Sequence, residues 1–248
     1  MEDVKTFFDR IAPYYDRIVQ MAGANYILWS KYIKLLLSQN APGRRILDIS
    51  AGTGSLDALL VKEGFDVYAM DVSFAMLKQS LHRGLGGRLV AGSFDAIPFS
   101  SGAFDAAIST FDSLNTVLSS DELLRVFREV HRVLVDGGVF LFDMNSPYSY
   151  RTYWDGLERV DEGGGMMVVW RAFRNGAITR LRIDIFLREG RCWRRISGEL
   201  LERAYPLRTI IGLLRRAGFS RVICLNHMGL SPCGRSTMRY QIMAFKIV

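Results

Sequence analysis

The chain has 248 residues, 49% of them apolar, and a formal net charge of +7. This length and composition suit one large folded core with a modest added module, and they exclude a disordered chain. No apolar run of about 18 residues is present, and residues 1–10 lack the apolar centre of a signal peptide, so we expect a soluble, cytoplasmic protein without a membrane partner.

Arginine supplies most of the positive charge, with 26 Arg against 6 Lys. A basic surface can attract nucleic acid, an anionic lipid or an acidic metabolite. The charges never form a run of five or more, which is typical of a solvated surface instead. The three cysteines, Cys192, Cys224 and Cys233, fit no zinc-binding spacing, and we expect reduced thiols with no metal and no disulfide.

The first forty residues predict two helices that form an N-terminal cap. Apolar side chains recur at helical spacing from Phe7 to Ile18 and again from Tyr26 to Leu37. Pro42 and Gly43 then interrupt the chain. We therefore place a helical cap at residues 1–40.

From residue 41 to residue 147, short apolar runs alternate with helical patterns. Strands are predicted over residues 45–50, 66–71, 88–93, 104–110 and 139–143. Helices are predicted between them, and the last begins at the capping box Ser119–Glu122 and ends at Asp136-Gly137-Gly138. This alternation indicates an α/β fold, a mostly parallel sheet with helices on both faces.

Residues 148–204 break this rhythm. Three long strands are predicted, over residues 166–173, 177–187 and 191–204, and Asn175-Gly176 is a strong hairpin signal. We interpret this segment as an antiparallel β module inserted into the α/β domain. Residues 205–248 complete that domain with a helix opened by Pro206 and two final strands.

The segment Ile46–Gly54, ILDISAGTG, carries the strongest chemical signal. It closes a predicted strand and opens a predicted helix, where glycines let the backbone approach a ligand and the helix N-terminus offers free N–H groups. Asp71 ends the next strand, where a carboxylate can accept hydrogen bonds from both ribose hydroxyls. A dinucleotide site would place Asp57 against a pyrophosphate, so a phosphate-free nucleoside such as S-adenosylmethionine fits better.

Five segments in order resemble the motifs of class I S-adenosylmethionine-dependent methyltransferases. They are ILDISAGTG, AMDVSFAML, AGSFDAIPF, FDAAIST and VLVDGGVFLFD, and the resemblance covers about residues 7–147 and 200–247. The family implies a Rossmann-like fold, S-adenosylmethionine as cofactor and methyl transfer as activity.

The resemblance also implies roles for individual residues. Asp48 would hold the first turn and Asp71 would bind the ribose. The cofactor-binding residues implied are Tyr15, Trp29, Asp48, Ser50, Ala51, Gly52, Gly54, Asp71, Val72, Met76, Ser93, Phe94, Asp95, Thr110 and Phe111. Two departures stand out: Ser50 replaces the first glycine of the turn, and Ser93 replaces an aspartate near the adenine, leaving open whether Ser93 or Asp95 holds the adenine amino group.

The phrase FDSLN, the inserted strands and ERAYPL resemble a small-molecule branch that includes glycine N-methyltransferase and sugar N,N-dimethyltransferases. In that branch the insertion covers the substrate pocket or builds an oligomer interface, which leaves a homodimer open. Asp112 and Asn115 follow the fourth strand directly, so we expect them to face the acceptor as catalytic residues. His131, Tyr150 and Tyr153 are further candidates for a base, with His131 expected to be structural.

The segment from Arg151 to Arg208 holds 12 Arg and no Lys. One hypothesis is that some of these arginines bind an anionic substrate group, and the alternative is a charged outer face of the strands.

Two other functions stay open. An RNA methyltransferase would suit the basic charge, but FDSL stands where an Asn-Pro-Pro-aromatic tetrapeptide would mark such an enzyme. A binding protein without catalysis is permitted by Ser50 and Ser93. A nicotinamide-dependent dehydrogenase is disfavoured by Asp57.

Overall fold

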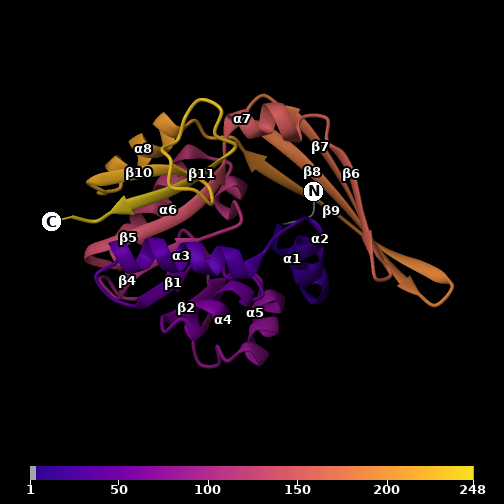
Figure 1. Ribbon diagram of the computed structural model, residues 1–248, viewed down its shortest axis with the longest axis horizontal. Coiled ribbons are helices and arrows are strands. Elements are labelled where there is room, and N and C mark those ends of the chain that lie inside the picture. Colours follow the sequence, from indigo (N-terminus) through magenta and orange to yellow (C-terminus); the bar gives the residue numbers. More distant parts are fainter. Residues whose placement is uncertain (1–3, 248) are drawn as a thin grey trace.

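The computed structural model describes residues 4–247, which form two sheets with helices around them (Figure 1). The larger sheet has seven strands in the order β10-β11-β5-β4-β1-β2-β3. Their bounds are β1 Arg45–Asp48, β2 Asp66–Asp71, β3 Leu89–Ala91, β4 Phe104–Ser109, β5 Leu134–Asn145, β10 Arg221–Asn226 and β11 Arg239–Phe245. Within this sheet β11 runs antiparallel to its neighbours β5 and β10, and the other strand pairs are parallel. The predicted mostly parallel α/β sheet is confirmed.

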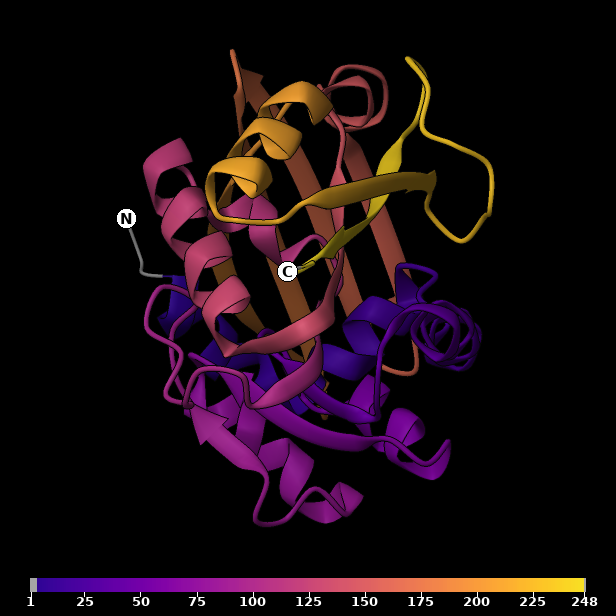
Figure 2. The ribbon, with the colours of Figure 1, turned by 90° about the vertical axis from the view of Figure 1, so that its left-hand side faces the viewer.

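Helices cover both faces of this sheet, as alternating strands and helices require. One face packs against α6 (Ser120–Val133) and α8 (Leu207–Arg216), and the other against α3 (Tyr26–Asn40) and α4 (Ser55–Lys62). Figure 2 shows α6 and α8 on one side of the sheet and α3 on the other. A further helix, α5 (Phe74–Ser80), follows β2, and single turns η2 (Leu81–Arg83) and η3 (Ser113–Thr116) lie in the connections.

The second sheet is antiparallel and has the order β6-β7-β8-β9. Its strands are β6 Glu158–Gly163, β7 Met166–Asn175, β8 Ile178–Glu189 and β9 Cys192–Arg203, and it is reached from β5 through the turns α7 (Pro147–Ser149) and η4 (Tyr150–Trp154). Figure 1 shows the β8–β9 hairpin extending beyond the rest of the molecule.

The N-terminal helices α1 (Val4–Ile11) and α2 (Tyr15–Met21) pack on the inner face of this second sheet. Phe7, Ile11 and Ile18 are buried there. A Cβ atom on residue 198 would lie only 1.9 Å from Cδ2 of the Phe7 ring. Glycine at position 198 therefore lets α1 dock on β9.

Three element predictions were wrong in part. The first predicted helix is divided into α1, the 3-10 turn η1 (Ala12–Tyr14) and α2, because Pro13 has no N–H to continue an α-helix. Strand β6 was not predicted, since Glu158–Gly163 carries one apolar side chain and no clear alternation. Asp136-Gly137-Gly138 lies inside β5, where Gly137 N–H donates to the Lys246 carbonyl at 2.7 Å.

The prediction of three reduced thiols was also wrong. Cys224 and Cys233 form a disulfide, and Cys192 is free and exposed. A β-bridge between Leu225 and Pro232 folds this loop back on itself and leaves the two Cα atoms 5.5 Å apart, within the range that a disulfide needs. The comparison with zinc-binding spacings could not reveal this disulfide, because the pairing of Cys224 with Cys233 depends on the local hairpin between them.

No helix within residues 4–247 is both long and apolar enough to span a bilayer.

Candidate active site

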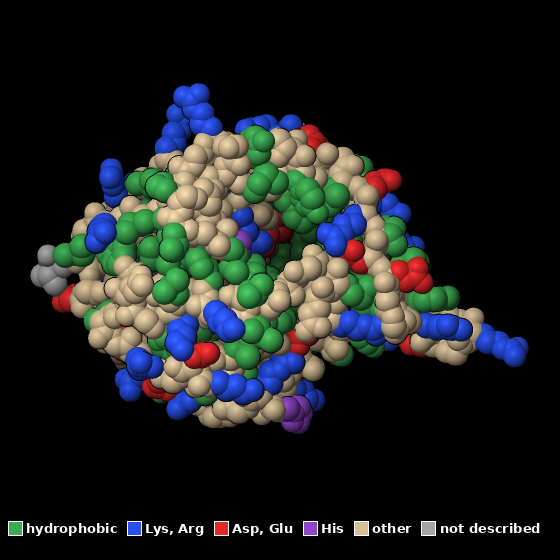
Figure 3. All heavy atoms as spheres, in the orientation of Figure 1, with side chains coloured by type: hydrophobic (Ala, Val, Ile, Leu, Met, Phe, Trp, Pro, Cys, Tyr) green, Lys and Arg blue, Asp and Glu red, His purple; other side chains and the backbone are tan. Residues whose placement is uncertain are grey.

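A pocket of about 750 Å³ lies where the larger sheet, the N-terminal helices and the antiparallel sheet meet. Figure 3 shows it as a hollow in the middle of this face of the molecule, with charged side chains visible inside. Its lining includes Ser50, which follows β1, Asp71, which ends β2, and Asp112, which follows β4. Ligands of open α/β sheets bind at these carboxyl ends of the strands.

The turn after β1 is held by hydrogen bonds to its backbone. Asp48 accepts a bond from Ser50 N–H at 2.8 Å, and Ala51 N–H donates to the Met70 carbonyl at 3.0 Å. The Ser50 hydroxyl lies 2.9 Å from the Ser109 hydroxyl. Ser50 lies outside the positive-φ region that favours glycine, so a serine fits where the family more often has glycine.

The two glycines of this turn serve different purposes. Gly52 lines the pocket with φ +55°, and its N–H donates to Asp71 at 2.8 Å. Gly54 does not line the pocket; it precedes α4 with φ +70°, and a Cβ there would stand 2.6 Å from the Ser80 hydroxyl. Ala51 and Asp48 likewise shape the turn from behind the pocket wall.

Asp71 ends β2 and lines the pocket. One carboxylate oxygen accepts from Gly52 N–H and the other from Ser73 N–H, each at 2.8 Å. Burial raises the pKa of the Asp71 carboxyl, while these backbone bonds oppose the shift. Each oxygen keeps a further lone pair that can accept a ligand hydroxyl.

The residues expected around an adenine also lie on the wall. Val72 is 46% exposed and Met76 is buried, and both line the pocket. Ser93, Phe94 and Asp95 line it as well, and the Ser93 hydroxyl donates to Asp95 at 2.7 Å. Ser93 and Asp95 therefore act as one hydrogen-bonded pair.

Asp57 does not face the pocket, so the sequence argument that set it against a pyrophosphate was wrong. It is fully buried beneath the turn, and neither of its carboxyl oxygens has a hydrogen-bond donor. Its neighbour is Asp48; burial raises the pKa of Asp48 to about 7 and raises the pKa of Asp57 well above its ordinary value. Burial and the neighbouring Asp48 carboxyl both disfavour the ionised form of Asp57.

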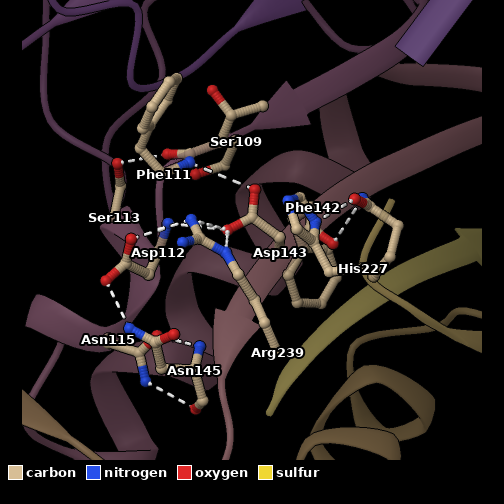
Figure 4. Close-up of polar contacts among 12 residues, drawn as sticks. Ser109, Phe111, Asp112, Ser113, Asn115, Phe142, Asp143, Asn145, His227 and Arg239 are labelled. Carbon is tan, nitrogen blue, oxygen red and sulfur yellow. Dashed lines mark hydrogen bonds and ion pairs between the residues drawn. The ribbon is translucent and has the colours of Figure 1, made fainter. Parts of the chain in front are cut away.

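The turn after β4 adopts an unusual backbone conformation. Phe111 and Asp112 have consecutive positive φ values, 58° and 50°, which non-glycine residues adopt only at a cost. Asp143 on β5 accepts both of their N–H groups, at 3.2 and 2.8 Å (Figure 4). Asp143 thereby holds the strained turn that presents Asp112 to the pocket.

Asp112 is fixed by two further partners. Arg239 on β11 donates to Asp112 at 2.9 Å and to Asp143 at 2.7 Å, and the Asn145 amide donates to Asp112 at 2.7 Å (Figure 4). Burial raises the pKa of the Asp112 carboxyl, and Arg239 opposes that rise. The carboxylate is thus oriented on the pocket wall.

Asn115 and Thr110, both expected at the site, lie behind the wall. Asn115 is fully buried; its amide donates to the Arg203 carbonyl at 2.8 Å and its oxygen accepts from Asn145 N–H at 2.9 Å. Thr110 is 4% exposed, and its carbonyl accepts from the Ser113 hydroxyl. Both support the turn, and neither side chain reaches the pocket.

Aromatic residues of α2, of α3 and of the turn after β4 line the site. Trp29 stacks on Phe111 with ring centroids 4.0 Å apart, and the Arg239 guanidinium lies 5.1 Å from the Trp29 ring. Tyr15 covers the first turn, 3.8 Å from where a Cβ on Gly52 would stand. Tyr15, Trp29 and Phe111 all line the pocket.

The polar pocket residues that the sequence did not single out include Arg239, His227 and Glu202. His227 Nδ1 lies 3.1 Å from the Gln241 amide oxygen, and its buried Nε2 has no partner. Glu202 on β9 accepts from the Tyr150 hydroxyl at 2.7 Å, and burial raises the pKa of Glu202 to about 8. Arg239 and His227 belong to no local motif. Glu202 begins the phrase ERAYPL, which carried the resemblance to the small-molecule branch but implied no role for this glutamate.

The other candidate bases are placed differently. Tyr150 is buried against Glu202, and Tyr153 lines the pocket. His131 packs edge-on against Phe219 with ring centroids 5.1 Å apart and does not line the pocket, as expected of a structural histidine.

The arginines of the inserted segment mostly pair with acids on the sheet surface. Three of them, Arg171, Arg182 and Arg195, surround Asp184. Of the twelve, Arg159 alone lines the pocket, and it is paired with Asp161 at 2.8 Å. This arrangement favours the charged outer face over an anion-binding role.

The geometry fits the cofactor that the resemblance implies. Gly52 leaves open space at the turn, Asp71 offers free lone pairs for ribose hydroxyls, and Ser93 with Asp95 offers a donor and acceptors for an adenine edge. No lysine or arginine lies among the pocket residues that follow β1 and β2.

Comparisons with known proteins agree with this geometry. A family model described as a methyltransferase domain matches residues 47–142. The chain is 26% identical over 217 residues to YqeM of Bacillus subtilis (strain 168), a protein named as a methyltransferase, and the match covers 86% of each chain. The chain spans 54–58% of the length of other curated methyltransferases that it matches at 30% identity or more.

Solved structures show the same fold. An S-adenosylmethionine-dependent methyltransferase from Clostridium acetobutylicum ATCC 824 superposes with a TM-score of 0.85 at 24% identity, over 97% of this chain and 99% of that one. The sugar N-methyltransferase KedS8 from Streptoalloteichus sp ATCC 53650 gives 0.79 at 23% identity, over 94% and 93%. A methyltransferase domain model thus matches residues 47–142, and the chain shares its fold with solved S-adenosylmethionine-dependent methyltransferases.

Proposed function

We propose that the enzyme transfers a methyl group to a nitrogen or oxygen of a small molecule by in-line displacement. The observation that carries this proposal is one continuous pocket that runs from Asp71, on the cofactor side, to Asp112 and Glu202 on the other side. When bound, S-adenosylmethionine supplies an activated methyl group on a sulfonium that leaves as a neutral thioether. The protein's main contribution is then alignment, which can lower a barrier by roughly 7–11 kcal/mol.

Asp112 is the residue we assign to the acceptor. Its carboxylate is held by Arg239 and Asn145, so it can orient an acceptor hydrogen or take the proton of an ammonium before attack. Tyr15 and Trp29 line the pocket with aromatic rings, which would keep water from the path between the two ligands. A small-molecule acceptor also agrees with the sugar substrate named for KedS8.

Calorimetry with S-adenosylmethionine and S-adenosylhomocysteine tests the cofactor half of the proposal. A panel of small amines and alcohols, assayed by mass spectrometry for S-adenosylhomocysteine formation, tests the acceptor half. For an acceptor that turns over, Asp112→Asn should lower kcat/KM by about 100-fold or more, while cofactor affinity changes less than twofold. Absence of cofactor binding in the wild-type protein would overturn the proposal.

A further inference from the structure

The antiparallel sheet gives the pocket an apolar wall that the cofactor residues do not use. Trp170 on β7 stands opposite Ile183 on β8, and Leu181 stands opposite Leu200 on β9. Alternate residues of a strand share a face, so these four side chains lie together on the inner face of the sheet. All four line the pocket.

This wall ends in carboxyl groups. Glu202 follows Leu200 by two residues on the same face of β9, and it lines the pocket together with Asp112. Arg239, the arginine beside them, is already paired with Asp112 and Asp143. An anionic acceptor group would therefore meet two carboxyls beside a guanidinium that is already neutralised, whereas an amine would meet acceptors for its hydrogens.

The pocket also opens to solvent between apolar side chains. Tyr153 and Met228 line it and are 43% and 38% exposed, so they lie at its mouth. An apolar body lying on the wall could extend to this mouth without meeting an unpaired charge, because Arg159 on the same sheet is bound to Asp161.

We propose that the acceptor is an amphipathic amine whose nitrogen meets Asp112 and Glu202 and whose apolar body lies on Trp170, Leu181, Ile183 and Leu200. This inference rests on the proposed function and narrows its substrate class. The ammonium proton passes to the Asp112 carboxylate and then to solvent. The nitrogen lone pair forms the new N–C bond as the S–C bond breaks, which leaves a methylated ammonium and a neutral thioether.

Titration calorimetry of primary n-alkylamines, from butylamine to decylamine, into protein saturated with S-adenosylhomocysteine tests the inference. Burying each added methylene on the wall should tighten Kd by about three- to fourfold until the chain reaches the mouth. The n-alkanoates of equal length should bind at least tenfold more weakly. A Kd independent of chain length, or alkanoates that bind as well as the amines, would overturn the inference.

Two leucines of β8 provide a matched pair of variants. Leu181 and Leu187 point to the same face and are 5% and 7% exposed, but only Leu181 lines the pocket. Leu181→Asn should abolish the gain per methylene, and Leu187→Asn should preserve it. If the affinity depended equally on chain length in both variants, the apolar wall would not be the binding surface. If either variant fails to fold, the alkylamine series with the wild-type protein still tests the inference.

The affinity for S-adenosylhomocysteine, measured first, separates the two proposals. No binding would refute the proposed function itself. Normal binding followed by a flat alkylamine series would refute only the amphipathic amine.

Discussion

Single carboxylates fix the turns after β1 and β4, which both line the pocket. Asp71 accepts the Gly52 N–H of the first turn, and Asp143 accepts the N–H groups of Phe111 and Asp112 in the second. Each of these acids organises backbone from a different strand. Their loss should therefore change more than one contact.

Asp71→Ala should weaken S-adenosylmethionine binding by at least tenfold, about 1.4 kcal/mol, because both the ribose acceptor and the support of Gly52 are lost. Titration calorimetry measures the dissociation constant of S-adenosylmethionine for the variant and for the wild type. Asp66→Ala is the matched control, since Asp66 begins the same strand and pairs on the surface with Arg45 and Arg88. Equal losses in the two variants would contradict the ribose assignment.

Asp143→Ala should destabilise the protein by about 3–5 kcal/mol, because it removes a buried carboxylate partner of the half-buried Arg239 and releases the strained turn at Phe111 and Asp112. Urea unfolding gives the free energy. The surface pairs of Asp66 are worth only about 0–1 kcal/mol, so Asp66→Ala again serves as the reference. A loss for Asp143→Ala within that range would show that the turn keeps its shape without Asp143.

At the scale of elements, the sequence predicted those parts of the site that lie close together along the chain. The turn after β1 and the acid that ends β2 were predicted because glycines and a strand-end aspartate fall within one short stretch of sequence. Arg239 was not, because it reaches Asp112 through the pairing of β11 with β5, in which Arg239 stands opposite the sequence-distant Asn145. Glu202 was not singled out, because no local signal places this end of β9 at the pocket. Strand β6 was missed because its sequence does not alternate between apolar and polar residues. Only its pairing with β7 shows that it is a strand.

The docking of α1 on the antiparallel sheet yields a prediction for one glycine. Gly198→Ala should destabilise the protein by about 1–3 kcal/mol, since its Cβ would overlap the Phe7 ring. Limited proteolysis should then cut within residues 4–21, and adding Phe7→Leu should recover part of the loss. Gly212→Ala is the control: nothing lies within 4 Å of its Cβ position in α8, so a gain of roughly 0.5–1 kcal/mol is expected there. Additive losses in the Phe7–Gly198 double variant would contradict this packing.

At the scale of the whole molecule, the buried Asp48–Asp57 pair links stability to pH. Burial raises the pKa of Asp48 from 3.8 to about 7, and that of Asp57 further. The native state therefore holds protons that the unfolded chain releases near pH 4. Where the native state binds more protons, stability falls as pH rises, so the unliganded protein should lose stability from about pH 4 through pH 7 and above.

Asp57→Asn removes one acid of this pair and gives Asp48 an amide donor. The variant should unfold with a free energy about 1–3 kcal/mol higher than wild type at pH 8, and the gain should shrink towards pH 5, where the wild-type pair keeps its proton. Urea unfolding across pH 5–8 measures this, and each kcal/mol corresponds to roughly 2–4 °C in Tm for a chain of this size. Asp136→Asn, which changes an exposed acid of β5, should leave the profile unchanged. Parallel pH profiles for wild type and Asp57→Asn would contradict a raised pKa for the buried pair as the source of this pH dependence.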